Sequence, residues 1–370
     1  VIIGSSTMGT PTGQLYVGGN IPSGTLKSIS TGTGTGPSSV AVQGKYAYVT
    51  LSSTSKLMVY DISDPSNPVA VNGTGTATAN GGSDVFVSGH YAYVTNGGTG
   101  NNGSLQIFDI SNPSSPSSVS TTATSTAGTG TSFTSGVYVQ GRYAYVVNYN
   151  STSSANMFQI FDVSNPAHPV AVNGSGAAGG TGAYGSESIY VSGRYAYVVN
   201  SVGNYSFSIY DISNPASVTA PIETQATATS QPGVIYIQGS YAYVSGGGSN
   251  RIEIWNISNP TSPSAVNTSI PTASGPDSIY IQGRYMYVAE YSNTLETFDI
   301  SDPSSVSSLG TIGTGIGGTI GAPELVVQGR YAYVANYGGN AFQTFDLGGE
   351  YAEQFQAGGI DTDTLQVNNN

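Results

Sequence analysis

The sequence predicts an all-β protein, a seven-bladed β-propeller built of four-stranded antiparallel blades. The main observation is a tract, G-x-Y-[AM]-Y-V, that occurs seven times at intervals of 44 to 52 residues. Self-similarity at such a period is typical of a propeller or a solenoid. The copies begin at Gly44, Gly89, Gly141, Gly193, Gly239, Gly283 and Gly329. The second observation is that alternating apolar runs flank each copy, and the third is that no segment shows helical periodicity.

Each repeat contains four predicted strands, A to D. Strand A is an alternating run such as SVAVQG, DVFVSG or SIYVSG, and strand B is the tract itself. Strand C is an apolar run that ends in Asp, such as QIFDIS, and a turn with proline leads to a weaker strand D such as PVAVN. The glycine between A and B supplies the positive φ that a short hairpin needs.

The tyrosines of strand B alternate with Ala and Val, so neither face of the predicted blade is polar. A sheet that is apolar on both faces must be covered on both, which happens when blades stack around an axis. Other tyrosines recur at fixed positions in strands A and C, and we interpret them as scaffold. They are Tyr60, Tyr138, Tyr190, Tyr210, Tyr236 and Tyr280.

One acidic residue per repeat follows strand C, just before S-[ND]-P. We interpret it as a turn residue that accepts backbone N–H bonds, since a catalytic acid does not need six copies. These residues are Asp61, Asp109, Asp162, Asp211, Asp299 and Asp346, with Asn256 at the equivalent position of the fifth repeat.

The combined motif G-x-Y-A-Y-V followed by I-F-D-[IV]-S-N-P resembles the LVIVD-repeat family of bacterial and archaeal surface and secreted proteins. The resemblance covers about residues 38 to 347. It implies a β-propeller and carries no particular enzymatic activity. The last repeat departs from the motif because Gly348 and Gly349 replace the Ser-Asn-Pro turn, which marks the end of the repeats.

The chain ends predict how the ring closes. GTLKSIS, residues 24–30, occupies the place that strand D holds before every later blade, so we expect it to complete the last blade. An eight-bladed propeller is the alternative, because QLYVGG at 14–19 resembles a strand C and DTLQVN at 363–368 a strand A. The predicted organisation is a stalk-like segment at 1–23, the propeller at 24–347 and a linker or start of a stalk at 348–370. Both ends resemble the Gly-rich β segments of fibre-like surface proteins.

Composition limits the classes of function and location. Of the 370 residues only 8% are charged, and the net charge of −12 repels phosphate backbones, which argues against nucleic acid as a partner. The absence of cysteine excludes thiolate metal sites and disulfides. No apolar run is long enough for direct membrane insertion. The start VIIGSSTMGT lacks an initiator Met and a signal-peptide pattern, so we interpret the chain as a mature or excised piece of an extracellular, cell-surface protein.

The variable loops predict the binding face. Length variation falls in the B–C and D–A connections, which leave a four-stranded blade on one face of the disc. Tyrosines follow strand B there and suit contact with a glycan or a surface protein; the alternative is that they cover loop backbone. The candidate residues are Tyr149, Tyr291 and Tyr337 with the neighbouring Asn148, Glu290 and Asn336, and Tyr205 close to the same position in the fourth blade.

Charged residues mark both openings of the predicted channel. Asp84, Glu187, Asp277 and Glu324 lie at the entry to strand A and could form a partial acidic ring. Calcium is the ion that such oxygen ligands would bind. The alternative is that these carboxylates are part of a solvated channel wall. On the opposite face a cation follows the A–B glycine, either to dock a partner or to protect strand ends. These cations are Lys45, His90, Arg142, Arg194, Arg284 and Arg330.

Catalysis finds little support in the sequence, and no other cofactor is expected. His90 and His168 are the only histidines, and neither has a sequence-level link to a serine and an acid. A propeller hydrolase or lyase would need His, Arg and carboxylates together at the axis. We therefore expect a non-enzymatic extracellular binding or adhesion module that contacts a glycan or a surface protein. The alternative is a self-assembling structural subunit of a surface filament, sheath or layer.

Overall fold

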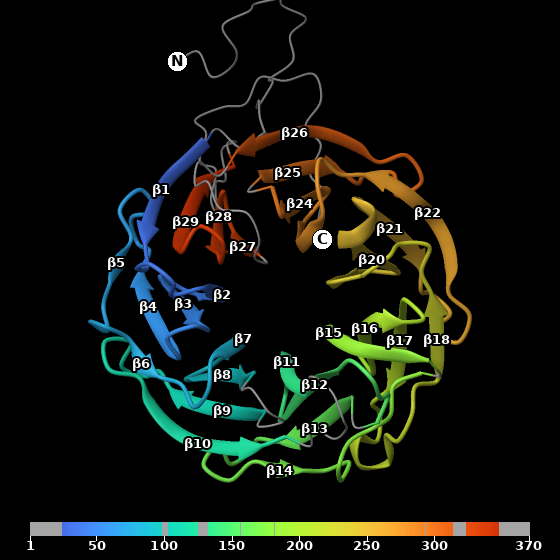
Figure 1. Cartoon of the computed structure of the whole chain (residues 1–370), viewed down its shortest axis with the longest axis horizontal. Coiled ribbons are helices and arrows are strands. Elements are labelled where there is room, and N and C mark those ends of the chain that lie inside the picture. Colours follow the sequence, from blue (N-terminus) through green and yellow to red (C-terminus); the bar gives the residue numbers. More distant parts are fainter. Residues whose placement is uncertain are drawn as a thin grey trace, which may run out of the picture.

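The computed structural model describes residues 24–97, 103–124, 132–155, 157–180, 182–292, 294–313 and 323–347. In these ranges seven antiparallel sheets stand around a central axis, as Figure 1 shows in a view down that axis. The seven-bladed prediction is confirmed. The stretches at 14–19 and 363–368, on which the eight-bladed alternative rested, lie outside the described residues.

Each of the first six blades runs outward from the axis in chain order. Blade 1 comprises β2 (Pro37–Gln43), β3 (Tyr46–Leu51), β4 (Lys56–Asp61), β5 (Val69–Ala70) and β6 (Thr76–Ala77). Blade 2 comprises β7 (Gly82–Ser88), β8 (Tyr91–Asn96), β9 (Ser104–Asp109) and β10 (Ser117–Ala123). Blade 3 comprises β11 (Ser132–Gln140), β12 (Tyr143–Asn150), β13 (Phe158–Asp162) and β14 (Val170–Ala171). Blade 4 comprises β15 (Ala183–Ser192), β16 (Tyr195–Gly203), β17 (Ser206–Asp211) and β18 (Glu223–Ala226).

The remaining three blades complete the ring. Blade 5 comprises β19 (Ile235–Gln238), β20 (Tyr241–Gly246), β21 (Arg251–Asn256) and β22 (Ser264–Pro271). Blade 6 comprises β23 (Pro276–Gln282), β24 (Tyr285–Glu290), β25 (Thr294–Asp299) and β26 (Ser307–Gly313). Blade 7 comprises β27 (Pro323–Gln328), β28 (Tyr331–Asn336), β29 (Ala341–Asp346) and β1 (Gly24–Ser30). In the part of the chain that the structure describes, the helical segments are two 3₁₀ turns, η1 (Pro215–Ser217) and η2 (Gly247–Ser249). Among the described residues, no helix is both long and apolar enough to cross a bilayer.

The N-terminal strand closes the ring, as predicted. Strand β1 pairs antiparallel with β29, with a register that runs from Gly24 opposite Asp346 to Ser30 opposite Ala341. Figure 1 shows this junction, where the first described strand lies beside the last described strand. Residues from both ends of the sequence therefore share one sheet.

The hydrophobic core lies between the blades. One cluster joins Tyr48 and Val59 of blade 1 to Val94 and Phe108 of blade 2. Six further clusters repeat this arrangement, and the last combines Tyr60 of blade 1 with residues of blade 7. Burial of apolar side chains on both faces of every blade stabilises the closed ring.

The short turns between strands A and B and after strand C are stabilised by glycine conformation and by side-chain hydrogen bonds. Each A–B glycine has positive φ, 60° at Gly44 for example, which confirms the predicted hairpins. The acids after strand C accept backbone N–H bonds, as at Asp61 Oδ1, to which Ser63 N donates at 2.9 Å. Equivalent bonds follow in five other blades. The interpretation as turn formers is confirmed for Asn256 and for all the predicted aspartates except Asp346, whose turn lies outside the described residues.

Candidate functional site

The innermost strands enclose a central channel with a cavity of about 1020 Å³. Every blade contributes its strand A to the wall, and the loops after strand B contribute the rim on the variable-loop face. Several sequence-predicted residues meet here. They are Tyr149, Tyr291 and Tyr337 together with Asp84, Glu187, Asp277 and Glu324.

Three rim tyrosines are seated on glycines. A Cβ atom on Gly185 would lie 2.9 Å from the Tyr149 ring, and one on Gly36 would lie 2.7 Å from the Tyr337 ring. Tyr291 packs in the same way on Gly275. This packing agrees with the alternative that the rings cover loop backbone, but they also line the cavity, and Tyr291 and Tyr337 remain 42% and 38% exposed. Their free ring surfaces are therefore available to a ligand at the channel entrance.

The polar neighbours of these tyrosines in the sequence do not share the rim. Asn148, Glu290 and Asn336 are buried, at 2%, 0% and 1% exposure. Asn148 Nδ2 donates to Gln159 at 3.3 Å, Asn336 Nδ2 donates to Gln343 at 3.0 Å, and Glu290 accepts from Ala273 N at 3.1 Å. Alternation along the strand sends neighbours to opposite faces. The prediction that these three residues contact a ligand is wrong, because they are buried inside the blades.

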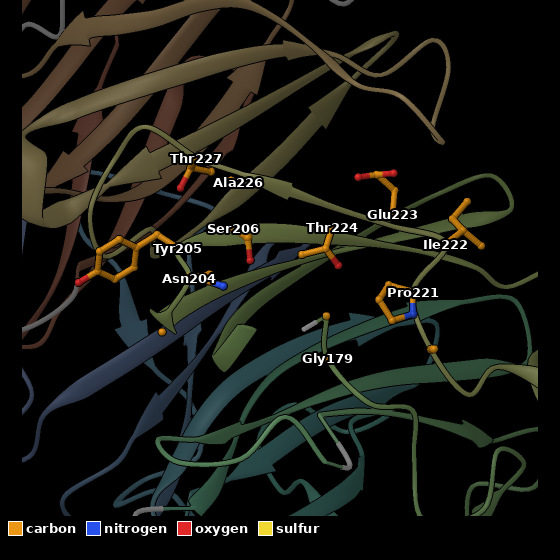
Figure 2. Close-up of a pocket in the computed structure, with 13 residues that line it drawn as sticks. Gly179, Asn204, Tyr205, Ser206, Pro221, Ile222, Glu223, Thr224, Ala226 and Thr227 are labelled. Atoms are coloured by element: carbon orange, nitrogen blue, oxygen red, sulfur yellow. The ribbon is translucent and has the colours of Figure 1, made fainter. Parts of the chain in front are cut away.

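Tyr205 is separate from the other tyrosines. It lines a second pocket of about 770 Å³ with Asn204, Ser206 and Thr227. Figure 2 shows Tyr205 at one end of this pocket, away from Glu223. Strand β16 extends to Gly203, and Tyr205 lies beyond its end. In this blade Ser201 occupies the position equivalent to Tyr149. The Ser201 hydroxyl donates to Glu187 Oε1 at 2.8 Å.

Two of the four channel carboxylates tie neighbouring blades together. Asp84 of blade 2 accepts from Ser39 Oγ of blade 1 and from Val137 N of blade 3, both at 2.8 Å. Glu324 of blade 7 lies within hydrogen-bonding reach of the Ser39 hydroxyl and accepts from the backbone N–H of Val40. Burial raises the pKa of both carboxyls, and these hydrogen bonds act against that increase. Asp84 and Glu324 are therefore structural as well as channel-lining groups.

Asp277 has fewer hydrogen-bond partners than Asp84 among the described residues. It accepts a hydrogen bond from the Tyr291 side chain, yet its Oδ2 atom is buried and has no hydrogen-bond partner among the described residues. Burial raises the pKa of Asp277 to about 7; the Tyr291 bond opposes this shift, and the charge of Glu187 adds to it. Burial also raises the pKa of Glu187.

The carboxylates interact electrostatically but do not form one metal site. The charge of Glu187 raises the pKa of Asp277, and the charges of Asp84 and Asp277 raise the pKa of Glu324. In the described ranges, no three His, Asp or Glu side chains lie close enough to hold a metal ion. The acids lie around the wall as separate groups, and calcium binding stays a prediction.

Below the carboxylates an arc of five aromatic rings follows the channel wall through blades 2 to 6. Successive ring centroids lie 4.8, 5.2, 4.9 and 5.6 Å apart. The rings are those of Phe86, Tyr138, Tyr190, Tyr236 and Tyr280. In blades 7 and 1, Val326 and Ala41 line the wall instead. We refer to these five rings as the aromatic arc.

The arc is the feature that sequence reasoning missed. The tyrosines of strand A were assigned to scaffold, although an aromatic residue stands three positions before the A–B glycine in five consecutive repeats. The side-chain hydroxyls of Tyr138, Tyr190 and Tyr236 hydrogen-bond to one another, and Tyr236 Oη donates to Ile281 O at 3.3 Å. Burial raises the pKa of Tyr138 to about 12, so its phenol stays neutral. The arc therefore presents uncharged π surface to the channel.

Cations on the opposite face are paired within their own blades. Lys45 Nζ lies 3.1 Å from Asp61 Oδ2, and Arg194 lies 2.6 Å from Asp211. Arg142, Arg284 and Arg330 pair with the equivalent aspartates. Each of these five cations also lies over the tyrosine that follows it. At His90 the contact is with Ser111 Oγ, 3.4 Å away. These contacts account for the cations within the fold.

The comparisons with known proteins agree with this architecture. A family profile described as LVIVD repeat matches residues 37–74, 81–124, 133–174, 185–223, 233–268, 276–314 and 321–340. A search of curated proteins gave no match.

Solved structures with similar folds share little sequence with the chain. A functionally unknown protein from Desulfotomaculum acetoxidans has a TM-score of 0.58 and 17% identity, over 75% of this chain and 85% of that one. A putative 6-phosphogluconolactonase from Bacteroides uniformis has a TM-score of 0.59 and 16% identity, over 74% and 84%. Raptor from Chaetomium thermophilum has a TM-score of 0.63 and 12% identity, over 91% and 30%. At these identities the likeness shows the fold alone.

Proposed function

The chain belongs to the LVIVD-repeat family, and from this premise we propose that it is a non-enzymatic binding module of a cell-surface or fibre protein. Its ligand enters the central channel through the variable-loop face. The observation that carries the proposal is the convergence of three rim tyrosines and four carboxylates from different blades on one cavity. A concave site with aromatic walls and a few placed polar groups is typical of ligand recognition.

Composition supports an extracellular setting for this module. The chain has few lysines and is rich in Gly, Ser, Thr and Asn. Among the described residues that line the cavity, the reactive groups are carboxyls and hydroxyls, without His, Lys or Arg. Together with the aromatic rings, these groups supply the apolar surface and the few placed polar groups that ligand recognition uses.

The experiment compares two faces of the disc. Wild-type protein, a Tyr291→Ser/Tyr337→Ser variant and an Arg194→Ser variant are tested for binding to intact microbial cells and to a glycan array. We expect the rim variant to lose binding at least tenfold and the Arg194→Ser variant, changed on the opposite face, to keep it. No binding of wild-type protein in either assay, or equal binding by all three proteins, would contradict the proposal.

Self-assembly into a surface layer or filament is the second candidate. The specific observation is that Val69 and Val170 occupy equivalent positions on the outer strands β5 and β14 and are 53% and 59% exposed. Apolar groups on an outer edge can pair with a neighbouring molecule. Electron microscopy of concentrated protein distinguishes the two, since ordered assemblies favour this candidate and isolated discs favour the binding module.

A further inference from the structure

We infer that the channel is built to receive an organic cation, namely a protonated amine or a quaternary ammonium group carried on a short carbon chain. This inference rests on the proposed function and specifies its ligand class. The cavity of about 1020 Å³ holds far more than a bare ion. Its wall divides into a carboxylate level near the rim and the aromatic arc below it.

The ionisable side chains at the carboxylate level of the channel are all acids. Asp84, Glu187, Asp277 and Glu324 line the cavity, and no lining residue that the structure describes is Lys, Arg or His. Burial disfavours the ionised form of each of these carboxyls while no counter-charge is present. A cation beside them stabilises that ionised form, so the wall favours a ligand that carries positive charge.

Several hydroxyls of the channel wall already have partners within the protein. The Tyr190 hydroxyl hydrogen-bonds with those of Tyr138 and Tyr236, Tyr236 Oη donates to Ile281 O, and Ser135 Oγ donates to Ser186 O. The carboxyls add acceptors to this wall, and an ammonium group, which has donors only, can satisfy them.

Asp277 marks the place where such a donor is missing. Its Oδ2 atom is buried without a hydrogen-bond partner in the described part of the chain, whereas Asp84 and Glu324 are held by neighbouring blades. A buried acceptor that lacks a donor is costly, so a ligand N–H group here gains binding energy. The Tyr291 side chain, bonded to Asp277, places a ring at the same point of the rim.

The aromatic arc suits the rest of such a ligand. Five ring surfaces follow one another at 4.8 to 5.6 Å along the wall, two to three residues beyond the carboxylates in each strand that carries both. Ring faces attract a cation electrostatically and also shield an alkyl chain from water. A metal ion would use neither property, and no three acids gather to chelate one among the described residues.

The test uses three probes on the intact protein: 1,5-diaminopentane, tetramethylammonium and 1,5-pentanediol, the last of which matches the diamine in length without charge. Isothermal titration calorimetry should give an affinity for the two cations at least tenfold above that for the diol. That affinity should fall as sodium chloride rises. Equal affinity for diamine and diol, or no binding of either cation, would overturn the inference.

Variants locate the binding. Asp277→Asn and Tyr236→Leu should each weaken diamine binding tenfold or more, while Asp302→Asn, in an exposed turn, should not. Unchanged binding by the first two would overturn the inference. The wild-type probe series remains decisive if a variant fails to fold.

The failures of the two proposals are separable. If the diamine binds but cells and glycans do not, the proposed surface function fails and the ligand class stands. If cells or glycans bind through Tyr291 and Tyr337 but no cation binds, the ligand class fails alone.

Discussion

Glu290 stands where four other blades have asparagine at the end of strand B. In blades 2, 3 and 7 the asparagine amide donates to a glutamine of strand C, as Asn336 does to Gln343 at 3.0 Å. In blade 6 the partner is Glu296, so two carboxyls hydrogen-bond and one of them must hold a proton. Burial, reinforced by Glu296 and opposed by hydrogen bonds from Thr294 and Ala273, raises the pKa of Glu290 to about 7.

This pair predicts a pH-dependent stability. The folded-state pKa of Glu290 is raised, so its favourable contribution is present below about pH 4.5 and is lost as pH rises through about 7. Glu290→Gln restores the amide pattern of the other blades. We expect the loss of stability between pH 5 and pH 8 to be smaller in this variant than in wild type by about 2 kcal/mol.

Thermal unfolding followed by calorimetry at both pH values measures this difference. Asp302→Asn, at an exposed turn, is the control and should keep the wild-type pH profile. A Glu290→Gln profile parallel to wild type would show that the carboxyl pair does not titrate in this range.

At the scale of elements, the hairpins between strands A and B carry a second set of links between blades. Gln43 at the end of β2 donates from Nε2 to the carbonyl of Gly89 in the next blade, at 2.9 Å. Gln140, Gln238, Gln282 and Gln328 make the same bond to the following blade. In blades 2 and 4 the equivalent residue is serine. The repeated Gln-Gly of the sequence thus links blades as well as turning the chain.

Gln328 tests the value of this link because its bond to Gly44 O joins the last blade to the first. Gln328→Ala should lower the free energy of unfolding by about 1 kcal/mol, the usual size of one hydrogen bond. The matched control is Ser192→Ala, at the equivalent position of blade 4, which should change stability little. Chemical denaturation compares the two, and equal effects would refute a specific role for the glutamine.

Strands A to C were predictable because their apolar alternation and turn glycines recur, and β1 matches the predicted 24–30 segment. The rim tyrosines followed from loop position. The aromatic arc was missed because alternation does not say which face of strand A turns toward the axis. Tyr205 does not join the rim tyrosines because β16 runs on to Gly203 and shifts the loop that follows it. Asn148, Glu290 and Asn336 are buried because strand pairing continues to the end of strand B.

At the scale of the whole molecule, closure of the ring shapes the channel. Asp84 and Glu324 take their partners from neighbouring blades, and Ser39 of blade 1, which donates to Asp84, lies beside both carboxyls. Blade 1 meets blade 7, which β1 completes through its pairing with β29. A disturbance of β1 should therefore affect both stability and the channel.

Deletion of residues 24–30 tests this coupling. Loss of the outer strand of blade 7 removes a ladder of hydrogen bonds and should lower the free energy of unfolding by roughly 3–5 kcal/mol. Addition of a peptide with the sequence GTLKSIS should recover part of the loss, and a scrambled peptide should not. Calorimetric melting measures both, and a deletion without effect would contradict closure by β1.

The most direct measurement for the channel as a whole is a crystal structure with tetramethylarsonium, a quaternary cation that the anomalous signal of arsenic locates without ambiguity. We expect an arsenic peak inside the channel, between Asp277 and the aromatic arc. An arsenic peak only outside the channel, or none at a concentration well above the measured dissociation constant of tetramethylammonium, would show that the channel is not a cation site.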